Sequence, residues 1–299
     1  MAEKSWLMEF PQMERKDLVG IRKSLDGLYR DFSREYGDLI ESFFDPLLYF
    51  LVWFEKLLLA TPWWVIIAVI TGLVYLATRS WKMSLGTIVA FMLIGYFGMW
   101  DNTMRTMSII LVCTLLSIVL GIPIGIAMAR SDRVQAVVTP MLDVMQTMPA
   151  FVYLIPVVML LGIGKVPGVI AVIIYAIPPV IRLTNLGIRL VDKEVMEAAT
   201  AYGASAFQRL YQVQLPLAMP TIMAGINQTI MMALAMVVIA SMIGVKGLGQ
   251  PVLKSITNQY FTMGLLNGLA IVVLAILFDR VSQAYAKRTQ KHLGGNQHG

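Results

Sequence analysis

The chain contains very little charge, histidine or cysteine. Only 14% of its 299 residues are charged and two are histidine, while 58% are hydrophobic; soluble domains carry about 25% charged residues. The single cysteine, Cys113, cannot form an intramolecular disulfide. The first forty residues contain no apolar stretch typical of a cleavable signal peptide. This composition excludes an ordinary soluble domain and indicates a protein that crosses a membrane several times.

Motifs for catalysis and ligand binding are also missing. The segment "GIGKVPG" (162–168) has a Gly-Lys pair, but it lacks the spacing and the following Ser/Thr of a phosphate-binding loop. No cluster of His, Cys and carboxylates has the spacing of a metal site. The net charge of +6 does not indicate nucleic-acid binding, because the basic residues lie in short loops beside apolar segments. We therefore expect no catalytic residue, no metal, no cofactor and no enzymatic activity in this chain.

Long apolar stretches are abundant, and they predict an all-α membrane protein built as a polytopic helical bundle. Each bilayer-spanning helix needs about 20 apolar residues, and polar breaks divide the chain into about seven such stretches. The predicted spans are 62–78, 83–100, 103–129, 136–162, 166–190, 217–245 and 262–280. Prolines remove helix hydrogen bonds, so we expect kinks inside or at the edges of the spans at Pro149, Pro156, Pro178, Pro179 and Pro220.

The distribution of basic residues predicts the orientation of the spans. Cytoplasmic loops carry an excess of Lys and Arg. If the polar loop that contains Glu197 is cytoplasmic, twelve basic residues share its side: Arg79, Lys82, Arg130, Arg133, Arg182, Arg189, Lys193, Arg209, Arg280, Lys287, Arg288 and Lys291. The outer short loops then carry four: Arg105, Lys165, Lys246 and Lys254. This orientation places the N-terminus outside and the C-terminal tail (284–299) in the cytoplasm.

Residues 1–60 form a separate N-terminal extension in this scheme. Residues 1–46 are polar, with charges of both signs. The stretch "PLLYFLVWFEKLLLA" (46–60) is short for a span and contains Glu55 and Lys56, so we expect a polar and amphipathic extension that ends in an interfacial helix. The alternative is that 46–60 is an eighth span, which would move the N-terminus to the cytoplasmic side.

One long polar segment, residues 193–216, interrupts the apolar sequence. Residues 193–202 are strong helix formers, and Gly203 can end that helix in a left-handed conformation. Ser205 and Gln208 have the spacing of a capping box that would start a second helix, ending near Gln214. Pro216 would mark the return to the membrane. From these local signals alone, the segment is either two short helices joined by a tight bend or an ordinary amphipathic loop.

The spacing within this segment resembles the EAA motif of ATP-binding-cassette importer permeases. That motif reads Glu-Ala-Ala, three residues, Gly, nine residues, an aliphatic residue, one residue and Leu-Pro. Here the matching positions are Glu197, Ala198, Ala199, Gly203, Val213, Leu215 and Pro216, and Val213 stands where Ile is usual. In that family the loop is the coupling helix, which docks in a cleft of the cytoplasmic ATPase subunit. The resemblance therefore implies that these residues couple the chain to an ATPase.

The resemblance extends over about residues 101–283. Residues 142–188 and 213–253 are similar to the glycine betaine/proline branch of these permeases, which implies the type I importer transmembrane fold, preceded by two spans in 61–100. It also implies two permease copies, two ATPase subunits and an extracytoplasmic substrate-binding protein in the cytoplasmic membrane. The expected cargo is a compatible solute such as glycine betaine, proline betaine or choline. The alternative, a secondary transporter or channel that works without ATP, predicts internal inverted repeats, and the sequence has no convincing repeat.

Polar residues inside predicted spans are further candidates for function. Asp143 and Arg182 lie near the inner ends of their spans and could form an intramembrane ion pair. Asn227, Gln228 and Thr229 could line a translocation path or could instead hydrogen-bond between helices.

Overall fold

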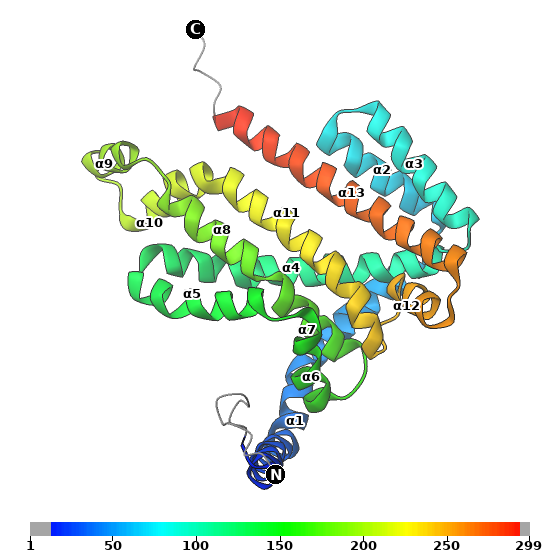
Figure 1. Cartoon of the computed structure of the whole chain (residues 1–299). Helices are drawn as coiled ribbons and strands as arrows, with labels where there is room; N and C mark the ends of the chain where they lie inside the picture. Colours follow the sequence, from blue (N-terminus) through cyan, green and yellow to red (C-terminus); the bar gives the residue numbers. More distant parts are fainter. Residues whose placement is uncertain (1–12, 294–299) are drawn as a thin grey trace, which may run out of the picture.

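The computed structural model describes residues 13–293, and every regular element within them is helical (Figure 1). Two elements are not α-helices: η1 is a π-helix and η2 a 3-10 helix. The elements are α1 (Arg15–Ala60), α2 (Trp63–Thr78), α3 (Trp81–Tyr96), α4 (Trp100–Arg130), α5 (Asp132–Thr147), α6 (Ala150–Leu161), α7 (Lys165–Ala176), α8 (Pro178–Arg189), α9 (Lys193–Ala201), α10 (Ala206–Gln208), η1 (Arg209–Gln214), α11 (Leu215–Ala240), η2 (Ser241–Ile243), α12 (Gly249–Asn258) and α13 (Phe261–Leu293).

Four helical segments are long and apolar enough to cross a membrane. They are Trp100–Arg130, Lys165–Arg189, Ala206–Ile243 and Phe261–Ala286. These segments correspond to the predicted spans 103–129, 166–190, 217–245 and 262–280. The polytopic all-helical prediction is therefore confirmed for the described residues.

The predicted span 136–162 is wrong as a single helix. It consists of α5 and α6, which meet at an angle of 102°. Met148 is extended (φ −66°, ψ 134°) between them, because the ring of Pro149 disfavours a helical conformation in the preceding residue. The sequence predicted a kink here, and the structure has a full break.

The two spans predicted before residue 100 are also shorter than expected. The helices α2 and α3 have 16 residues each, about 24 Å of helix, against about 30 Å of hydrocarbon. Residues Ser42–Ala60 of α1 and the whole of α2 form a second pair, bent by 108°. By length and composition, the described residues thus provide four candidate spans, or up to six if each bent pair counts as one, against the seven predicted.

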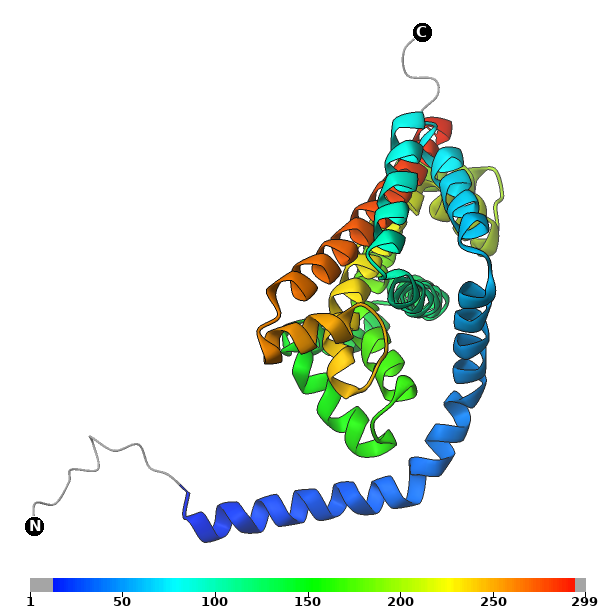
Figure 2. The same cartoon turned by 90° about the vertical axis from the view of Figure 1, so that its right-hand side faces the viewer.

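Helix α4 lies in the middle of the bundle. Figure 2 looks nearly along its axis, with α1 on one side and α11 and α13 on the other. Met104, Ile110 and Cys113 are fully buried in the main core cluster. Farther along the helix, a Cβ on Gly125 would lie 2.6 Å from the Cβ of Thr184. The absence of that side chain lets α8 cross α4 closely, which positions the end of α8 that leads to the polar segment.

Helix α1 is one continuous helix of 46 residues, although only 46–60 was predicted to be helical. Its second half joins the core through the buried Leu51, while its first half runs away from the bundle (Figure 2). There the Tyr29 hydroxyl donates to the carbonyl oxygen of Pro156. The Ser33 hydroxyl lies 3.4 Å from the carbonyl oxygen of Met159. Helix α1 thus contacts α6 at Tyr29 and α7 at Glu55. Residues 42–60 with α2 pass as one bent candidate span, so both the interfacial helix and the eighth span stay predictions.

Candidate functional site

The polar segment begins with a short helix that buries none of its residues. In α9, the Asp192 carboxylate caps the N-terminus by accepting a 2.9 Å hydrogen bond from the amide of Glu194. Glu197 is exposed and makes no hydrogen bond or ion pair with any residue that the structure describes. A carboxylate without a partner in the described part of the chain is available to bind another protein.

Gly203 forms the corner between the two arms of this segment. Its φ is +80°, a conformation that costs other residues about 1–2 kcal/mol. The amide of Gly203 donates to Thr200 O at 2.9 Å, and the amide of Ala204 donates to Ala199 O at 3.0 Å. A Cβ at Gly203 would meet no atom within 4 Å, so the glycine is needed for backbone conformation and not for space.

The second arm starts with the predicted capping box, which is confirmed. The amide of Ser205 donates to Gln208 Oε1 at 2.8 Å, and the amide of Gln208 donates to the Ser205 hydroxyl at 3.3 Å. The prediction that this arm ends near Gln214 is wrong, because α10, η1 and α11 form one unbroken helical segment from Ala206 to Ile243. Pro216 follows the π-helical turn Arg209–Gln214 and does not stop the helix.

A side-chain contact joins the two arms, and aromatic rings cover the outside of the corner. Arg209 Nη1 donates a 2.7 Å hydrogen bond to Thr200 Oγ1, beside a hollow of about 440 Å³ that Glu197 also lines. Tyr202 is 93% exposed, and the rings of Phe207 and Tyr211, both exposed, lie 4.3 Å apart. Rigid aromatic side chains on an exposed surface are typical of the centres of protein–protein interfaces. The corner can therefore bind a protein partner.

Residues 121–291 match the family of binding-protein-dependent transport system inner membrane components. The chain belongs to this family. It is therefore an inner-membrane permease component of a transport system, and such permeases work with an ATPase and a substrate-binding protein. The match supports the ATP-driven importer that the EAA motif predicted, and it does not support an ATP-independent transporter or channel.

Individual relatives agree with this assignment. The permease is 50% identical to the glycine betaine/proline betaine transport system permease protein ProW of Escherichia coli (strain K12), over 81% of this chain and 68% of that protein. It is 46% identical to the glycine betaine/carnitine transport permease protein GbuB of Listeria monocytogenes, over 78% and 83% of the two chains. A solved inward-facing structure of the MetNI methionine ABC transporter matches with a TM-score of 0.57 at 18% identity, covering 62% of this chain and 93% of that one. The permease thus has the fold of that importer.

The structure brings Asp143 and Arg182 of the permease together. Arg182 Nη2 donates to Asp143 Oδ1, which joins α5 to α8. The two side chains are 56% and 35% exposed, so this pair is not enclosed by its own chain. Arg182 Nε is buried and has no hydrogen-bond partner among the described residues.

The structure separates Asn227, Gln228 and Thr229 onto different faces of α11. Asn227 Nδ2 donates to Asp279 Oδ1 at 2.9 Å, and the hydroxyl of Ser282 donates to Asn227 Oδ1, so this residue joins α11 to α13. Gln228 is exposed and Thr229 is fully buried. Consecutive helical residues point about 100° apart, so the three side chains face different surroundings, and a translocation path at these positions stays a prediction.

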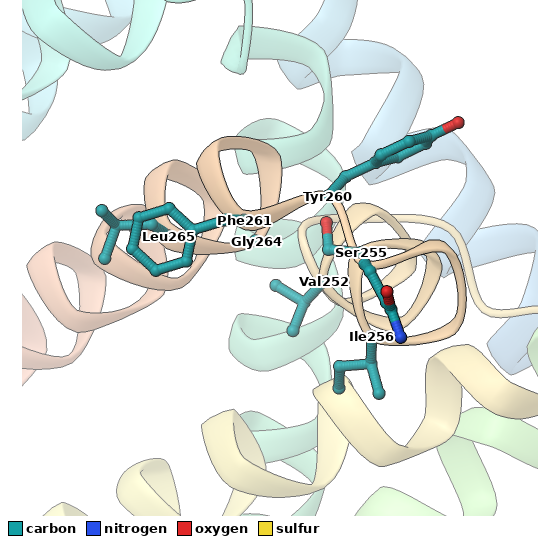
Figure 3. A pocket seen from close by; sticks show the side chains of 8 residues that line it. Val252, Ser255, Ile256, Tyr260, Phe261, Gly264 and Leu265 are labelled. Atoms are coloured by element: carbon teal, nitrogen blue, oxygen red, sulfur yellow. The ribbon is translucent and has the colours of Figure 1, made fainter.

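A second hollow, also of about 440 Å³, lies where α12 turns into α13 (Figure 3). Tyr260 and Phe261 line it, but their rings point to different sides. The Ser255 hydroxyl is already used within its own helix, donating to Pro251 O at 2.6 Å. The hollow therefore lacks the converging aromatic faces that hold a quaternary ammonium ion.

Sequence reasoning missed two polar contacts that join distant segments. Arg189 Nη2 donates to Met128 O at 2.9 Å and lies 2.7 Å from Asp132 Oδ1, which joins the end of α8 to the α4–α5 turn. The buried carboxylate of Glu55 lies between Lys165 and Arg105. No local pattern marks either contact, because the partners are 50 to 110 positions apart for Glu55 and 57 to 61 for Arg189.

Proposed function

We propose that this permease carries glycine betaine or a closely related quaternary-amine compatible solute, as a homodimer that binds two ATPase subunits. The observation that carries the solute assignment is that relatives 46–50% identical to the chain, ProW and GbuB, are named for glycine betaine transport. The EAA corner at Gly203 supports the coupling role of Glu197, Ala198, Ala199, Leu215 and Pro216. A separate binding protein selects the solute.

The proposed domain organisation follows the sequence boundaries. Residues 101–283 form the transporting domain, 61–100 precede it, and 1–60 are an extension, of which the described residues from 13 onward include contacts with it. The EAA corner and the C-terminal segment from residue 284 face the cytoplasm; residues 294–299 of that tail lie outside the described residues. Arg130 and Arg189, at the ends of α4 and α8 that lead toward the corner, support this orientation because basic residues gather on the cytoplasmic side.

Transport is then a population shift between two arrangements of the bundle. ATP binding draws the two ATPase subunits together, each subunit moves the corner docked in it, and the unbroken helix from Ala206 carries that displacement into the membrane. The permease itself contributes a path and a mechanical connection, while ATP hydrolysis takes place in the partner.

Uptake measurements test this proposal. Cells that lack other osmolyte importers would express the permease with its ATPase and binding protein and would be offered labelled glycine betaine, proline betaine, choline, carnitine and proline. We expect uptake of at least one quaternary amine, lost when the ATPase cannot bind ATP. Uptake that persists without a functional ATPase would contradict ATP coupling, and uptake of none of the quaternary amines would contradict the solute class.

A further inference from the structure

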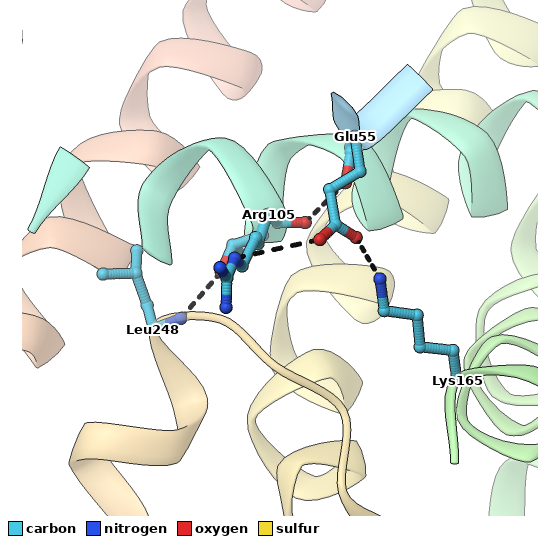
Figure 4. A network of polar contacts seen from close by, with 6 residues as sticks. Glu55, Arg105, Lys165 and Leu248 are labelled. Atoms are coloured by element: carbon cyan, nitrogen blue, oxygen red, sulfur yellow. Dashed lines mark hydrogen bonds and ion pairs between the residues drawn. The ribbon is translucent and has the colours of Figure 1, made fainter. Parts of the chain in front are cut away.

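Glu55 is a carboxylate that is buried between three helices. Its side chain is 10% exposed, and its Oε2 accepts a 2.6 Å hydrogen bond from Lys165 Nζ. Its other oxygen, Oε1, lies 3.8 Å from Arg105 Nε (Figure 4). Lys165 starts α7 and Arg105 lies near the start of α4, so a residue of α1 holds the ends of two core helices together. Lys165 and Arg189 are the two ends of one segment made of α7 and α8, and the Arg189 end leads to the EAA corner. Arg130 is likewise at the other end of α4 from Arg105.

The two cations are not bound equally. Lys165 has the short contact, whereas Arg105 Nε is buried and makes no hydrogen bond among the described residues. A buried charged donor without an acceptor is unfavourable. The acceptor it needs is the carboxylate 3.8 Å away, which a small shift of α4 relative to α1 would bring into hydrogen-bonding range.

The same turn of α4 is held from another direction as well. The hydroxyl of Thr106 accepts a 2.9 Å hydrogen bond from the amide of Leu248 (Figure 4). A Cβ on Gly247 would lie 2.5 Å from that hydroxyl oxygen, so the chain between η2 and α12 passes very close to α4. Arg105 and Thr106 therefore connect α1, α4 and the segment that follows the long α11 helix.

We propose that Glu55 is a positioning residue of the transport cycle, and that its carboxylate alternates between Lys165 and Arg105 as the ends of α4 and α7 move. In the arrangement of this structure Glu55 binds Lys165. In the arrangement that ATP favours, it binds Arg105 and releases Lys165. Without the carboxylate of Glu55, both Lys165 and Arg105 lack their shared anion, so neither arrangement of α4 and α7 is stabilised. The proposal rests on the importer function argued above.

The stability of the assembled transporter in two states tests the exchange. The permease–ATPase assembly would be purified in lipid nanodiscs, and its Tm measured without nucleotide and after trapping with ATP and orthovanadate. We expect Lys165→Gln to lower the Tm more than Arg105→Gln does without nucleotide, and the order to reverse in the trapped state. Equal effects in both states, or the same order in both, would contradict the exchange.

Transport by Glu55 variants gives the second measurement. We expect Glu55→Gln to reduce uptake about fivefold or more, and Glu55→Asp, which keeps the charge, to restore part of it. The control is Lys56→Gln, since Lys56 is the next residue of α1 and is exposed; its uptake should match that of the unmodified protein. Wild-type uptake by Glu55→Gln would overturn the proposal. The Tm comparison requires no solute, so it tests the exchange even if the solute assignment is wrong. A wrong solute assignment would instead appear as a wild-type assembly that transports none of the solutes offered.

Discussion

The guanidinium of Arg209 donates a 2.7 Å hydrogen bond to the hydroxyl of Thr200 across the corner formed by Gly203. This contact joins two arms that are each capped separately, α9 by Asp192 and α10 by Ser205. The corner therefore has a defined shape before any partner binds, which reduces the ordering cost of docking.

Substitution of Gly203 should uncouple transport without preventing membrane insertion. In Gly203→Val, the left-handed backbone conformation costs about 1–2 kcal/mol at an exposed site, so we expect normal expression and uptake lowered by roughly tenfold. Gly203→Asn should retain more activity, because Asn tolerates this conformation better. Gly72→Ala is the control, since Gly72 lies within α2 with nothing near a Cβ. Normal uptake by purified complexes with Gly203→Val would show that the bend is not required for coupling.

The contact of Asp143 with Arg182 should be structural. Both side chains are more than one-third exposed in the single copy, so the pair is worth at most about 1 kcal/mol unless the second copy covers it. We expect Asp143→Asn to lower the Tm of the detergent-solubilised assembly slightly, and the double change Asp143→Asn with Arg182→Gln to restore most of the loss. If Asp143→Asn leaves the Tm unchanged but abolishes uptake, the pair serves gating instead.

Asn227 and Gln228 should respond differently to the same substitution. Asn227→Leu breaks the contacts of α11 with Asp279 and Ser282 of α13, and we expect a loss of about 1 kcal/mol in stability, within the range of interhelical hydrogen bonds in membranes. Gln228→Leu changes an exposed position and should leave the Tm unaltered. A Tm effect for Gln228→Leu but none for Asn227→Leu would contradict the packing role of Asn227. If both variants keep their Tm but lose uptake, a path lined by these residues becomes the better interpretation.

Reporter fusions check the orientation. Fusions after Asp132, Lys193 and Lys287 should report the cytoplasm, and fusions after Lys165 and Lys254 the opposite side. The shared partner Glu55 places Arg105 at the same end of the bundle as Lys165, so a fusion after Arg105 should agree with that after Lys165. A cytoplasmic signal after Lys254 would contradict the predicted orientation of the chain that follows α11.

The sequence predicted the corner well because its signals are local. A glycine ends one helix and a Ser-x-x-Gln box starts the next, and both depend on residues within three positions of one another. The break at Met148 was only partly predictable. A proline indicates that one helix hydrogen bond is lost, but whether the helix kinks or breaks, here by 102°, depends on the surrounding packing. The contacts of Glu55 could not be predicted, since its partners Arg105 and Lys165 are 50 and 110 positions away in the sequence. A single carboxylate in an apolar stretch indicates only that the stretch is less suited to span a membrane.

The unbroken helix from Ala206 to Ile243 connects the corner directly to the opposite end of α11. With 38 residues its length is about 57 Å, and only four residues separate its far end from Leu248. The amide of Leu248 binds the same turn of α4 that faces Glu55. The π-helical turn at Arg209–Gln214 lies within this segment, between the corner and α11. A displacement of the corner can therefore reach α11 through the backbone only by way of that single turn.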